Sequence, residues 1–224
     1  DYYFDPPSNV ILYPGIAAPN LMTLGADIRQ LGDQAFATLR TLRNLQILRH
    51  YNYPVPPIID DTNYDWPIER GRKPLPHQKI YANFAVLHPK MFNLGDAGTM
   101  KTLSHLWATD FLMRQAEERG EKFRTIVIAP LSILDSVWGA AIFRNFLGKR
   151  TFRILTGDEN RRAKLLAEEV DFYIINPDGI KVGAWMKKGE IRMQGFAQQL
   201  ADRKDIQEII IDEEMSSASR CDLP

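Results

Sequence analysis

The stretch Asn93-Leu94-Gly95-Asp96-Ala97-Gly98-Thr99-Met100-Lys101-Thr102 decides which fold we expect of this chain. It lies between a short apolar segment, residues 91–94, and an amphipathic pattern typical of a helix, residues 102–119. Glycines in such a turn let backbone N–H groups point at phosphate oxygens, and the start of the next helix attracts anions. A lysine at this place reaches the β- and γ-phosphates, and the hydroxyl beside it binds magnesium. The stretch therefore predicts a phosphate-binding loop formed by Gly95, Asp96, Ala97, Gly98, Thr99, Met100, Lys101 and Thr102.

A second acidic segment supports this interpretation of the loop. Glu208-Ile209-Ile210-Ile211-Asp212-Glu213 reads as an apolar strand that ends in two carboxylates. In a parallel sheet the loop after the first strand and the acids after the last strand meet at the carboxyl edge, where ligands bind. We expect Asp212 to lie beside the magnesium ion and Glu213 beside the attacking water.

Between these two motifs, short apolar runs alternate with helical patterns. Strands are expected at residues 125–129, 152–155, 172–175 and 208–211, in addition to the one at 91–94. Helices are expected at 102–119, 132–147, 159–170 and 196–203. Such alternation predicts an α/β fold in which a parallel sheet is sandwiched by helices.

The first part of the chain follows different local rules. Eleven of the 14 prolines in the whole chain precede Met91. A helical pattern over residues 32–50 is followed by a proline-rich linker over residues 53–57. The sequence therefore predicts two regions: a small helical N-terminal appendage with its linker, residues 1–72, and an α/β lobe, residues 73–224.

The order of motifs resembles the first RecA-like lobe of superfamily-two helicases, with the Swi/Snf-type DNA-dependent ATPases, including those of bacteriophages, as the closest match. The resemblance covers about residues 70–220. It rests on Pro76-His77-Gln78, on Gly98-Thr99-Met100-Lys101-Thr102, on Ala129-Pro130-Leu131-Ser132 and on Asp212-Glu213.

The resemblance implies a role for each matching residue. Gln78 would hydrogen-bond adenine, Lys101 would neutralise the β/γ-phosphate charge, and Glu213 would orient or deprotonate water. Thr102 and Asp212 would hold magnesium. The residues expected to contact nucleic acid are Pro130, Leu131, Ser132, Asn176, Asp178 and Gly179.

The resemblance also implies cofactors and partners. These are ATP with Mg²⁺, double-stranded DNA, and a second RecA-like lobe of the same parent chain that supplies an arginine finger. The chain would then be a fragment with little turnover of its own. A cytoplasmic location is expected, inside the bacterial host if the protein is encoded by a phage.

Two methionines keep an alternative open. Met100 stands where the phosphate-loop motif has glycine, and a side chain at a position that needs positive φ costs roughly 1–2 kcal/mol. Met215 stands where the helicase family has a polar residue after its acids. The alternative is a degenerate module that keeps the fold, does not hydrolyse ATP, and binds DNA or a protein. A small-molecule kinase built on the same loop is disfavoured, because Gln78 and the Asp-Glu pair follow the helicase order.

Composition excludes several other classes. The 224 residues carry 28 basic and 28 acidic side chains, so the whole chain has no bulk attraction for nucleic acid, and any DNA contact must be local. The single cysteine, Cys221, cannot form an internal disulfide. No apolar run approaches the ~20 residues that cross a bilayer, so no membrane partner is expected. The four tryptophans, Trp66, Trp107, Trp138 and Trp185, are interpreted as packing anchors.

Overall fold

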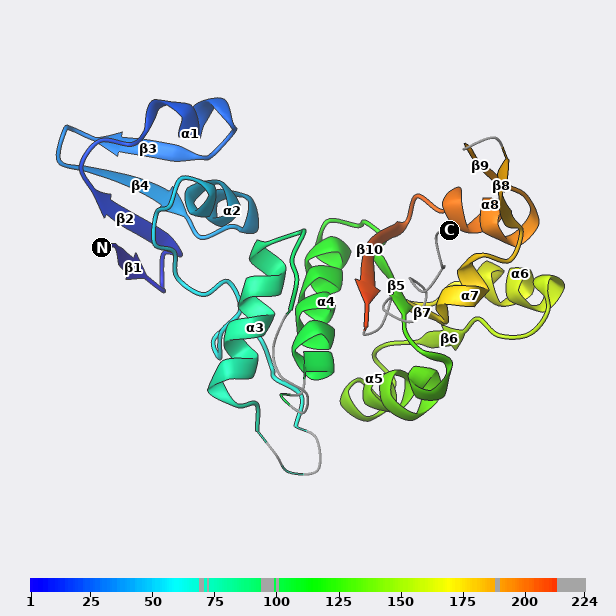
Figure 1. Ribbon diagram of the computed structural model, residues 1–224. Coiled ribbons are helices and arrows are strands. Elements are labelled where there is room, and N and C mark those ends of the chain that lie inside the picture. Colours follow the sequence, from blue (N-terminus) through cyan, green and yellow to red (C-terminus); the bar gives the residue numbers. More distant parts are fainter. Residues whose placement is uncertain (69–70, 72, 94–98, 100, 188–189, 213–224) are drawn as a thin grey trace, which may run out of the picture. The chain divides into compact units, whose positions relative to one another are not determined.

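A computed structural model describes residues 1–68, 71, 73–93, 99, 101–187 and 190–212. The chain divides into two compact units (Figure 1). Unit 1 comprises Asp1–Trp66 and Pro74–Ala108, and unit 2 comprises Pro67–Lys73 and Thr109–Pro224.

Unit 1 contains a four-stranded antiparallel sheet with the strand order β1-β2-β4-β3. Its strands are β1 (Tyr3–Asp5), β2 (Val10–Pro14), β3 (Ile28–Leu31) and β4 (Ala35–Leu39). Its helices are α1 (Pro19–Thr23), α2 (Leu42–His50) and α3 (Pro76–Leu87), followed by α4 (Lys101–Glu118), which enters unit 2 after Ala108.

The prediction of a small helical appendage was wrong. Residues 35–39 form β4, which pairs with two neighbouring strands, and the helix begins only at Leu42. Thr41 caps this helix by accepting a hydrogen bond from the backbone N–H of Asn44 at 3.3 Å. The helical spacing of apolar residues over 32–50 applies only from Leu42 onward, because Phe36 and Leu39 lie on opposite faces of β4.

An aromatic cluster covers the inner face of this sheet. Tyr13 and Phe36 stack with their ring centroids 5.0 Å apart, and the ring of Tyr53 meets both edge-on. The hydroxyl of Tyr13 donates to the carbonyl of Pro54 at 2.7 Å, and Arg40 Nε donates to the carbonyl of Pro57 at 2.7 Å. The extended proline-rich segment is therefore packed onto unit 1.

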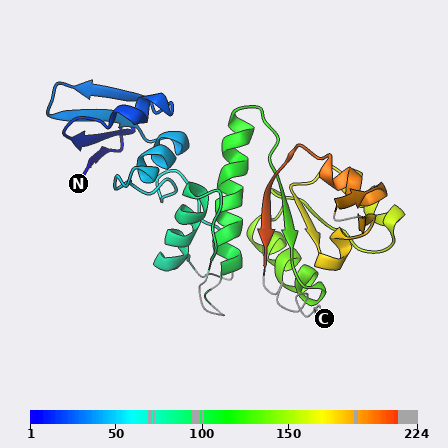
Figure 2. The same ribbon diagram turned by 45° about the horizontal axis from the view of Figure 1, so that its top comes forward.

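Unit 2 is built on a four-stranded parallel sheet with the order β10-β5-β7-β6 (Figures 1 and 2). The sequence predicted a parallel sheet, but not this strand order. Its strands are β5 (Arg124–Ile128), β6 (Phe152–Ile154), β7 (Phe172–Ile175) and β10 (Ile206–Ile211). Its helices beyond α4 are α5 (Ala140–Asn145), α6 (Glu159–Ala167), α7 (Pro177–Ile180) and α8 (Gly195–Ala201). A two-stranded ribbon of β8 (Ala184–Lys187) and β9 (Glu190–Met193) precedes α8.

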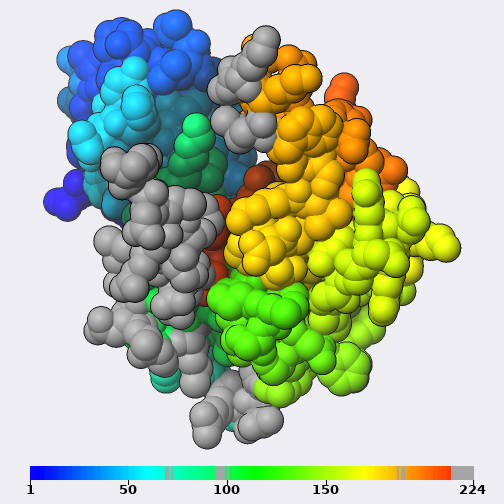
Figure 3. All heavy atoms as spheres, turned by 45° about the vertical axis from the view of Figure 1, so that its right-hand side comes forward, coloured from blue at the N-terminus to red at the C-terminus, as the bar shows by residue number. Residues whose placement is uncertain are grey.

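Helices cover both faces of the parallel sheet. On one face, Ile126 and Tyr173 of the sheet pack with Leu166 of α6 and Phe196 of α8. Figure 3 shows α6 (yellow-green) and the segment from α7 to α8 (yellow to orange) as adjoining parts of the surface of unit 2. On the other face, the hydroxyls of Thr109 in α4 and Thr125 in β5 both donate to Glu208 of β10, at 2.7 and 2.8 Å.

Two predicted elements differ from the structure. Residues 91–93 form no strand, and Phe92 is 90% exposed, whereas a strand beside the core would bury such a side chain; Leu94 lies outside the described residues. The helix predicted over 132–147 is divided into a 3-10 turn (Leu131–Ile133), a π-helical turn (Leu134–Gly139) and α5. The β8–β9 ribbon and α3 were not expected from the sequence.

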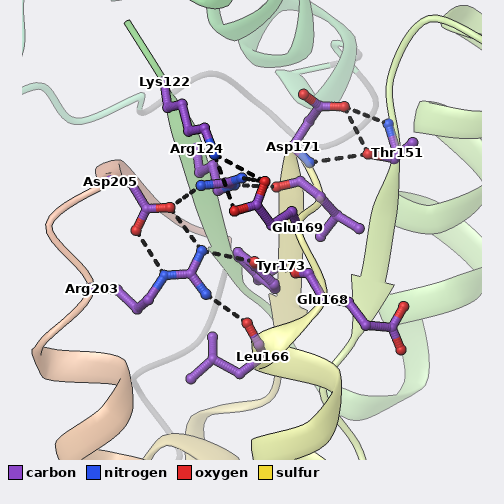
Figure 4. Close-up of polar contacts among 11 residues, drawn as sticks. Lys122, Arg124, Thr151, Leu166, Glu168, Glu169, Asp171, Tyr173, Arg203 and Asp205 are labelled. Carbon is purple, nitrogen blue, oxygen red and sulfur yellow. Dashed lines mark hydrogen bonds and ion pairs between the residues drawn. The ribbon is translucent and has the colours of Figure 1, made fainter.

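An ion-pair network joins the amino ends of the parallel strands (Figure 4). Asp205, just before β10, pairs with Arg124 at the start of β5 and with Arg203, whose Nε lies 2.7 Å from Asp205 Oδ1. Arg203 also donates to the hydroxyl of Tyr173 at 2.9 Å and to the carbonyl of Leu166 at 2.6 Å. These contacts tie β10, β5 and β7 together at the edge where the strands begin.

The charge of Asp205 should contribute to stability in a pH-dependent way. Hydrogen bonds from Arg203 hold the pKa of Asp205 well below its usual range. A carboxylate with a lowered pKa stabilises the folded state above its ordinary pKa, and this contribution is lost as the pH falls through the lowered value. We expect Asp205→Asn to reduce the unfolding free energy by about 1–2 kcal/mol at pH 7, and the deficit to shrink below about pH 4.

Urea unfolding at pH 7, 5 and 3 measures this difference. Asp202→Asn is the matched control, because Asp202 is exposed and its carboxylate is bonded only to the side chain of Gln198 among the described residues. A deficit for Asp205→Asn that is the same at pH 3 as at pH 7 would contradict the role of its charge.

Candidate functional site

Three of the predicted site segments follow parallel strands of unit 2 at their carboxyl ends. Asp212 comes directly after β10, the segment Pro130–Ser132 follows β5, and the segment Asn176–Gly179 follows β7. Because β10, β5 and β7 are adjacent and parallel, these segments share one edge of the sheet. This edge is the place where ligands bind in open α/β sheets.

Asp212 is held at this edge by two hydrogen bonds. Its backbone N–H continues the strand pairing by donating to the carbonyl of Ile128 at 2.9 Å. Its side-chain Oδ2 accepts from the indole Nε1 of Trp138 at 2.6 Å. Oδ1 has no hydrogen-bond donor within the described part of the chain. The bond from Trp138 thus orients the carboxylate.

The bond from Trp138 to Asp212 in the candidate site was not predicted from the sequence. Trp138 is only 1% exposed and belongs to the π-helical turn Leu134–Gly139. Turns of this kind occur mostly as single-turn insertions in helices, and they are frequent at functional sites. The interpretation of Trp138 as a packing anchor was incomplete, since the same side chain also orients Asp212. Nothing in the local sequence marks a π-helical turn, so the pattern of residues could not have revealed this role.

The segment after β5 is open at the surface. Leu131 is 66% exposed, and Ser132 is also exposed. The carbonyl of Ser132 accepts from the hydroxyl of Ser136 at 3.0 Å, which leaves the Ser132 hydroxyl outside this contact. Pro130 holds the cap position of the 3-10 turn that follows and makes no side-chain cap.

The segment after β7 combines packing and polar features. Asn176 precedes α7, and its buried Oδ1 has no partner among the described residues. Gly179 is buried, and a Cβ there would lie 2.5 Å from Arg162 Nη1, so a larger residue would force its neighbours to shift. Asp178 is exposed and pairs with Lys181 at 3.0 Å. Of these residues, Asn176 alone offers an unsatisfied buried polar atom at the sheet edge.

Arg162 supports this edge from α6. Its Nε donates to the carbonyl of Gly157 at 2.8 Å, and its Nη1 donates to the carbonyl of Leu155. Burial lowers the pKa of the Arg162 guanidinium. Its described partners are carbonyl groups and no carboxylates, so its positive charge is not neutralised by an ion pair within the described residues.

The remaining predicted site residues fall in unit 1 or outside the described residues. Lys101 is the first residue of α4, Thr102 is the second, and Thr99 lies just ahead of the helix; all three are partly buried. Their place at a helix start is the one that the phosphate-loop prediction requires. Gly95, Asp96, Ala97, Gly98, Met100 and Glu213 lie outside the described residues.

Gln78 is buried in unit 1, on α3. It is 2% exposed, and its Oε1 accepts from the backbone N–H of Leu75 at 2.8 Å, which helps to cap the helix. Its Nε2 has no hydrogen-bond partner among the described residues. A carbonyl oxygen carries a second lone pair, so the amide retains one donor group and one acceptor site. The structure thus gives Gln78 a structural role and leaves it the polar capacity that the adenine prediction requires.

A further carboxyl group on β10, that of Glu208, also has a shifted pKa. Burial raises the pKa of Glu208, and the hydrogen bonds from Thr109 and Thr125 oppose that shift. Glu208 points to the α4 face of the sheet and is bonded there, so it belongs to the packing between α4 and the sheet. Asp212, which directly follows β10, is the carboxylate that lies at the carboxyl edge.

No protein-family model and no curated protein matches the chain. Within the described residues, no group of three histidine, cysteine or acidic side chains is arranged to hold a metal ion. Magnesium in nucleotide sites usually takes only one or two protein ligands together with phosphate oxygens and water, so a single oriented carboxylate fits that chemistry. None of the described helices is long and apolar enough to cross a membrane.

The hydrogen bond between Trp138 and Asp212 can be tested by a double-mutant cycle. Trp138→Phe removes the indole donor and keeps an aromatic ring, and Asp212→Ala removes the acceptor. We expect a coupling free energy of about 1–2 kcal/mol, because a hydrogen bond to a charged group is lost in either single variant. Urea unfolding of the four proteins measures it.

Trp185→Phe, combined with the same Asp212→Ala change, provides the control. Trp185 lies on β8 and is 44% exposed, so it should show no coupling to Asp212. Equal coupling in both cycles would contradict a specific bond from Trp138.

Proposed function

We propose that this chain is the ATP-binding lobe of a nucleic-acid-dependent ATPase of the superfamily-two, Swi/Snf-like class, acting on double-stranded DNA. The carrying observation is the oriented Asp212 at the carboxyl end of a parallel strand, with Trp138 holding one oxygen. Lys101 and Thr102 lie at the start of α4, which is the position that a phosphate-binding loop requires, and this also supports the proposal. A RecA-like arrangement of the lobe is part of this proposal.

The chemistry follows from the residue types. Lys101 would neutralise phosphate charge, and Thr102 and Asp212 would hold a magnesium ion. Bound magnesium would polarise a phosphoryl oxygen as a Lewis acid. Glu213 would orient or deprotonate the attacking water. Phosphoryl transfer of this kind depends on positioning and charge neutralisation, with little covalent chemistry by the protein.

Nucleotide selection is assigned to Gln78 within this proposal. Its unpartnered Nε2 would donate to a ring nitrogen of adenine, and its Oε1 would accept from the exocyclic amino group. The amide is buried, so the base would have to reach it through a local rearrangement of the residues that cover it.

Within this proposal, nucleic acid binds to the exposed segment Pro130–Ser132 after β5. Backbone N–H groups and short hydroxyl side chains contact phosphate without requiring a basic surface. This suits a chain whose net charge is zero. Asn176 would add a polar contact from the neighbouring strand end, whereas Asp178 with its Lys181 partner and the packed Gly179 are less suited to bind phosphate.

The degenerate-module hypothesis remains the second candidate, and Met100 motivates it. The two candidates differ in whether hydrolysis occurs in a longer protein that carries both lobes. DNA-stimulated hydrolysis by that protein favours the motor. Hydrolysis that appears only after Met100→Gly favours the degenerate module. An arginine finger from the second lobe is worth ~10³–10⁵ in rate in such enzymes, so the comparison requires the two-lobe protein.

Binding of Mg²⁺-ATP tests the nucleotide site directly. We expect isothermal titration to detect binding to the chain, and Lys101→Ala to weaken it by about tenfold or more, because a charge-assisted contact to phosphate is lost. Lys90→Ala is the matched control, since Lys90 is exposed and lies in the same unit ahead of the loop. Absence of binding, or equal binding by the Lys101→Ala variant, would contradict the proposal.

Binding of duplex DNA tests the segment after β5. Ser132→Glu places a negative charge on an exposed position where phosphate is expected, so affinity should fall by about tenfold at fixed salt, while ATP binding is retained. Fluorescence anisotropy with a labelled 20-base-pair duplex measures this. Gln198→Glu adds the same charge on exposed α8 and should have little effect; equal losses in both variants would argue against a local contact.

A further inference from the structure

The antiparallel sheet of unit 1 has a second face that carries apolar side chains. The strand register puts ten side chains on this side, which we call the outer face: Tyr3, Asp5, Val10, Leu12, Pro14, Arg29, Leu31, Ala35, Ala37 and Leu39. All but Asp5 and Arg29 are apolar or aromatic. Tyr3 is 63% exposed, Leu31 is 42% exposed and Leu39 is 41% exposed.

This pattern differs from that of a sheet with one solvated face. Such sheets alternate apolar residues toward the core with polar residues toward water. In β2 and β4 the alternation is lost, because apolar residues occupy the inner positions Ile11, Tyr13 and Phe36 and nearly all of the outer ones as well. The inner face has its cover, since Tyr53 packs on Tyr13 and Phe36. The composition of the outer face is that of an interface.

The two charges of the outer face lie on opposite edges of the sheet. Asp5 is on β1 and Arg29 is on β3, which are the two edge strands. Asp5 Oδ2 accepts from Ser8, and Arg29 has no acidic partner among the described residues. One arginine offset by one aspartate is a poor surface for nucleic acid, which requires several basic groups. The arrangement suits a partner with the same charges in reversed order.

A second copy of the same face has that reversed order. A two-fold axis parallel to the strands lays β1 of one copy over β3 of the other, so that each Asp5 faces the Arg29 of its partner. Asp5 aligns with Val10 and Leu39 across the sheet, whereas Arg29 aligns with Ala37 and Leu12, one outward row away. That offset is about 7 Å along a strand, within reach of an arginine side chain in sheets that cross at about 30°.

We propose that two copies of this chain associate through the outer faces of their unit 1 sheets, forming a symmetric β-sandwich with reciprocal Asp5–Arg29 ion pairs. The same patch serves both partners, as two-fold symmetry requires. Four short strands spaced ~4.8 Å apart cover on the order of 300 Å² of sheet, well below the ~800 Å² per partner of stable complexes. The dimer is therefore weak and forms at micromolar concentration.

Sedimentation velocity on the whole chain, from about 1 to 200 μM, tests the proposal. We expect a monomer–dimer equilibrium within this range for the wild type. Leu12→Glu, which places a charge at the centre of the outer face, should remove the dimer throughout it. Leu147→Glu is the control, because Leu147 is 69% exposed but lies in unit 2, and dimerisation should persist.

Charge reversal tests the orientation and does not rely on the central substitution. Arg29→Glu and Asp5→Arg should each raise the dissociation constant by about tenfold, and the double variant should restore most of the affinity. Circular dichroism confirms that each variant is folded. A monomeric wild type at every concentration, or a dimer that survives Leu12→Glu, would overturn the proposal; a double variant no better than the single ones would overturn the two-fold arrangement.

Discussion

The parallel pairing of β10 with β5 is the constraint on which the rest of unit 2 depends. Its register places Ile211 beside Ile128, and the same ladder continues into the bond from the Asp212 N–H to the Ile128 carbonyl. A shift of one residue would turn Glu208 and Ile210 away from the face on which they are packed and move Asp212 along the sheet edge. The position of the candidate carboxylate is therefore fixed by backbone hydrogen bonds before any side chain acts on it.

The buried strands could be predicted because their sequences consist almost entirely of apolar residues. Residues 125–129 and 172–175 are nearly continuous apolar runs, which a strand covered on both faces requires. The N-terminal sheet was missed for the complementary reason. Its outer positions are as apolar as its inner ones, so β2 and β4 lack the alternation that identifies a strand with one solvated face. The feature that hid this sheet from the sequence analysis is the one that makes its outer face a candidate interface.

The candidate site could be predicted only as far as chemical type and chain order allow. A carboxylate after an apolar strand and a Lys-Thr pair at a helix start are readable in sequence, and the structure places Asp212 and Lys101 at such positions. The orientation of Asp212 was not readable, because it depends on Trp138, which is far away in sequence and sits in a π-helical turn. Motif residues show which chemical groups are available, whereas packing determines which other residues hold those groups in place.

The polar groups at the two edges of the parallel sheet differ in how fully they are paired. At the amino edge, Asp205 is bonded to both Arg124 and Arg203. Arg203 also donates hydrogen bonds to the hydroxyl of Tyr173 and the carbonyl of Leu166. These groups satisfy one another, so they hold the strands together and offer little to a ligand. At the carboxyl edge, Asp212 keeps one oxygen and Asn176 keeps one buried oxygen without a partner among the described residues. A buried polar atom left without a partner costs about 1–3 kcal/mol, and the ion pairs at the opposite edge help the fold to tolerate that cost. Polar groups that destabilise the free protein are the ones that a ligand can satisfy, so the imbalance between the two edges is itself an argument for function at the carboxyl side.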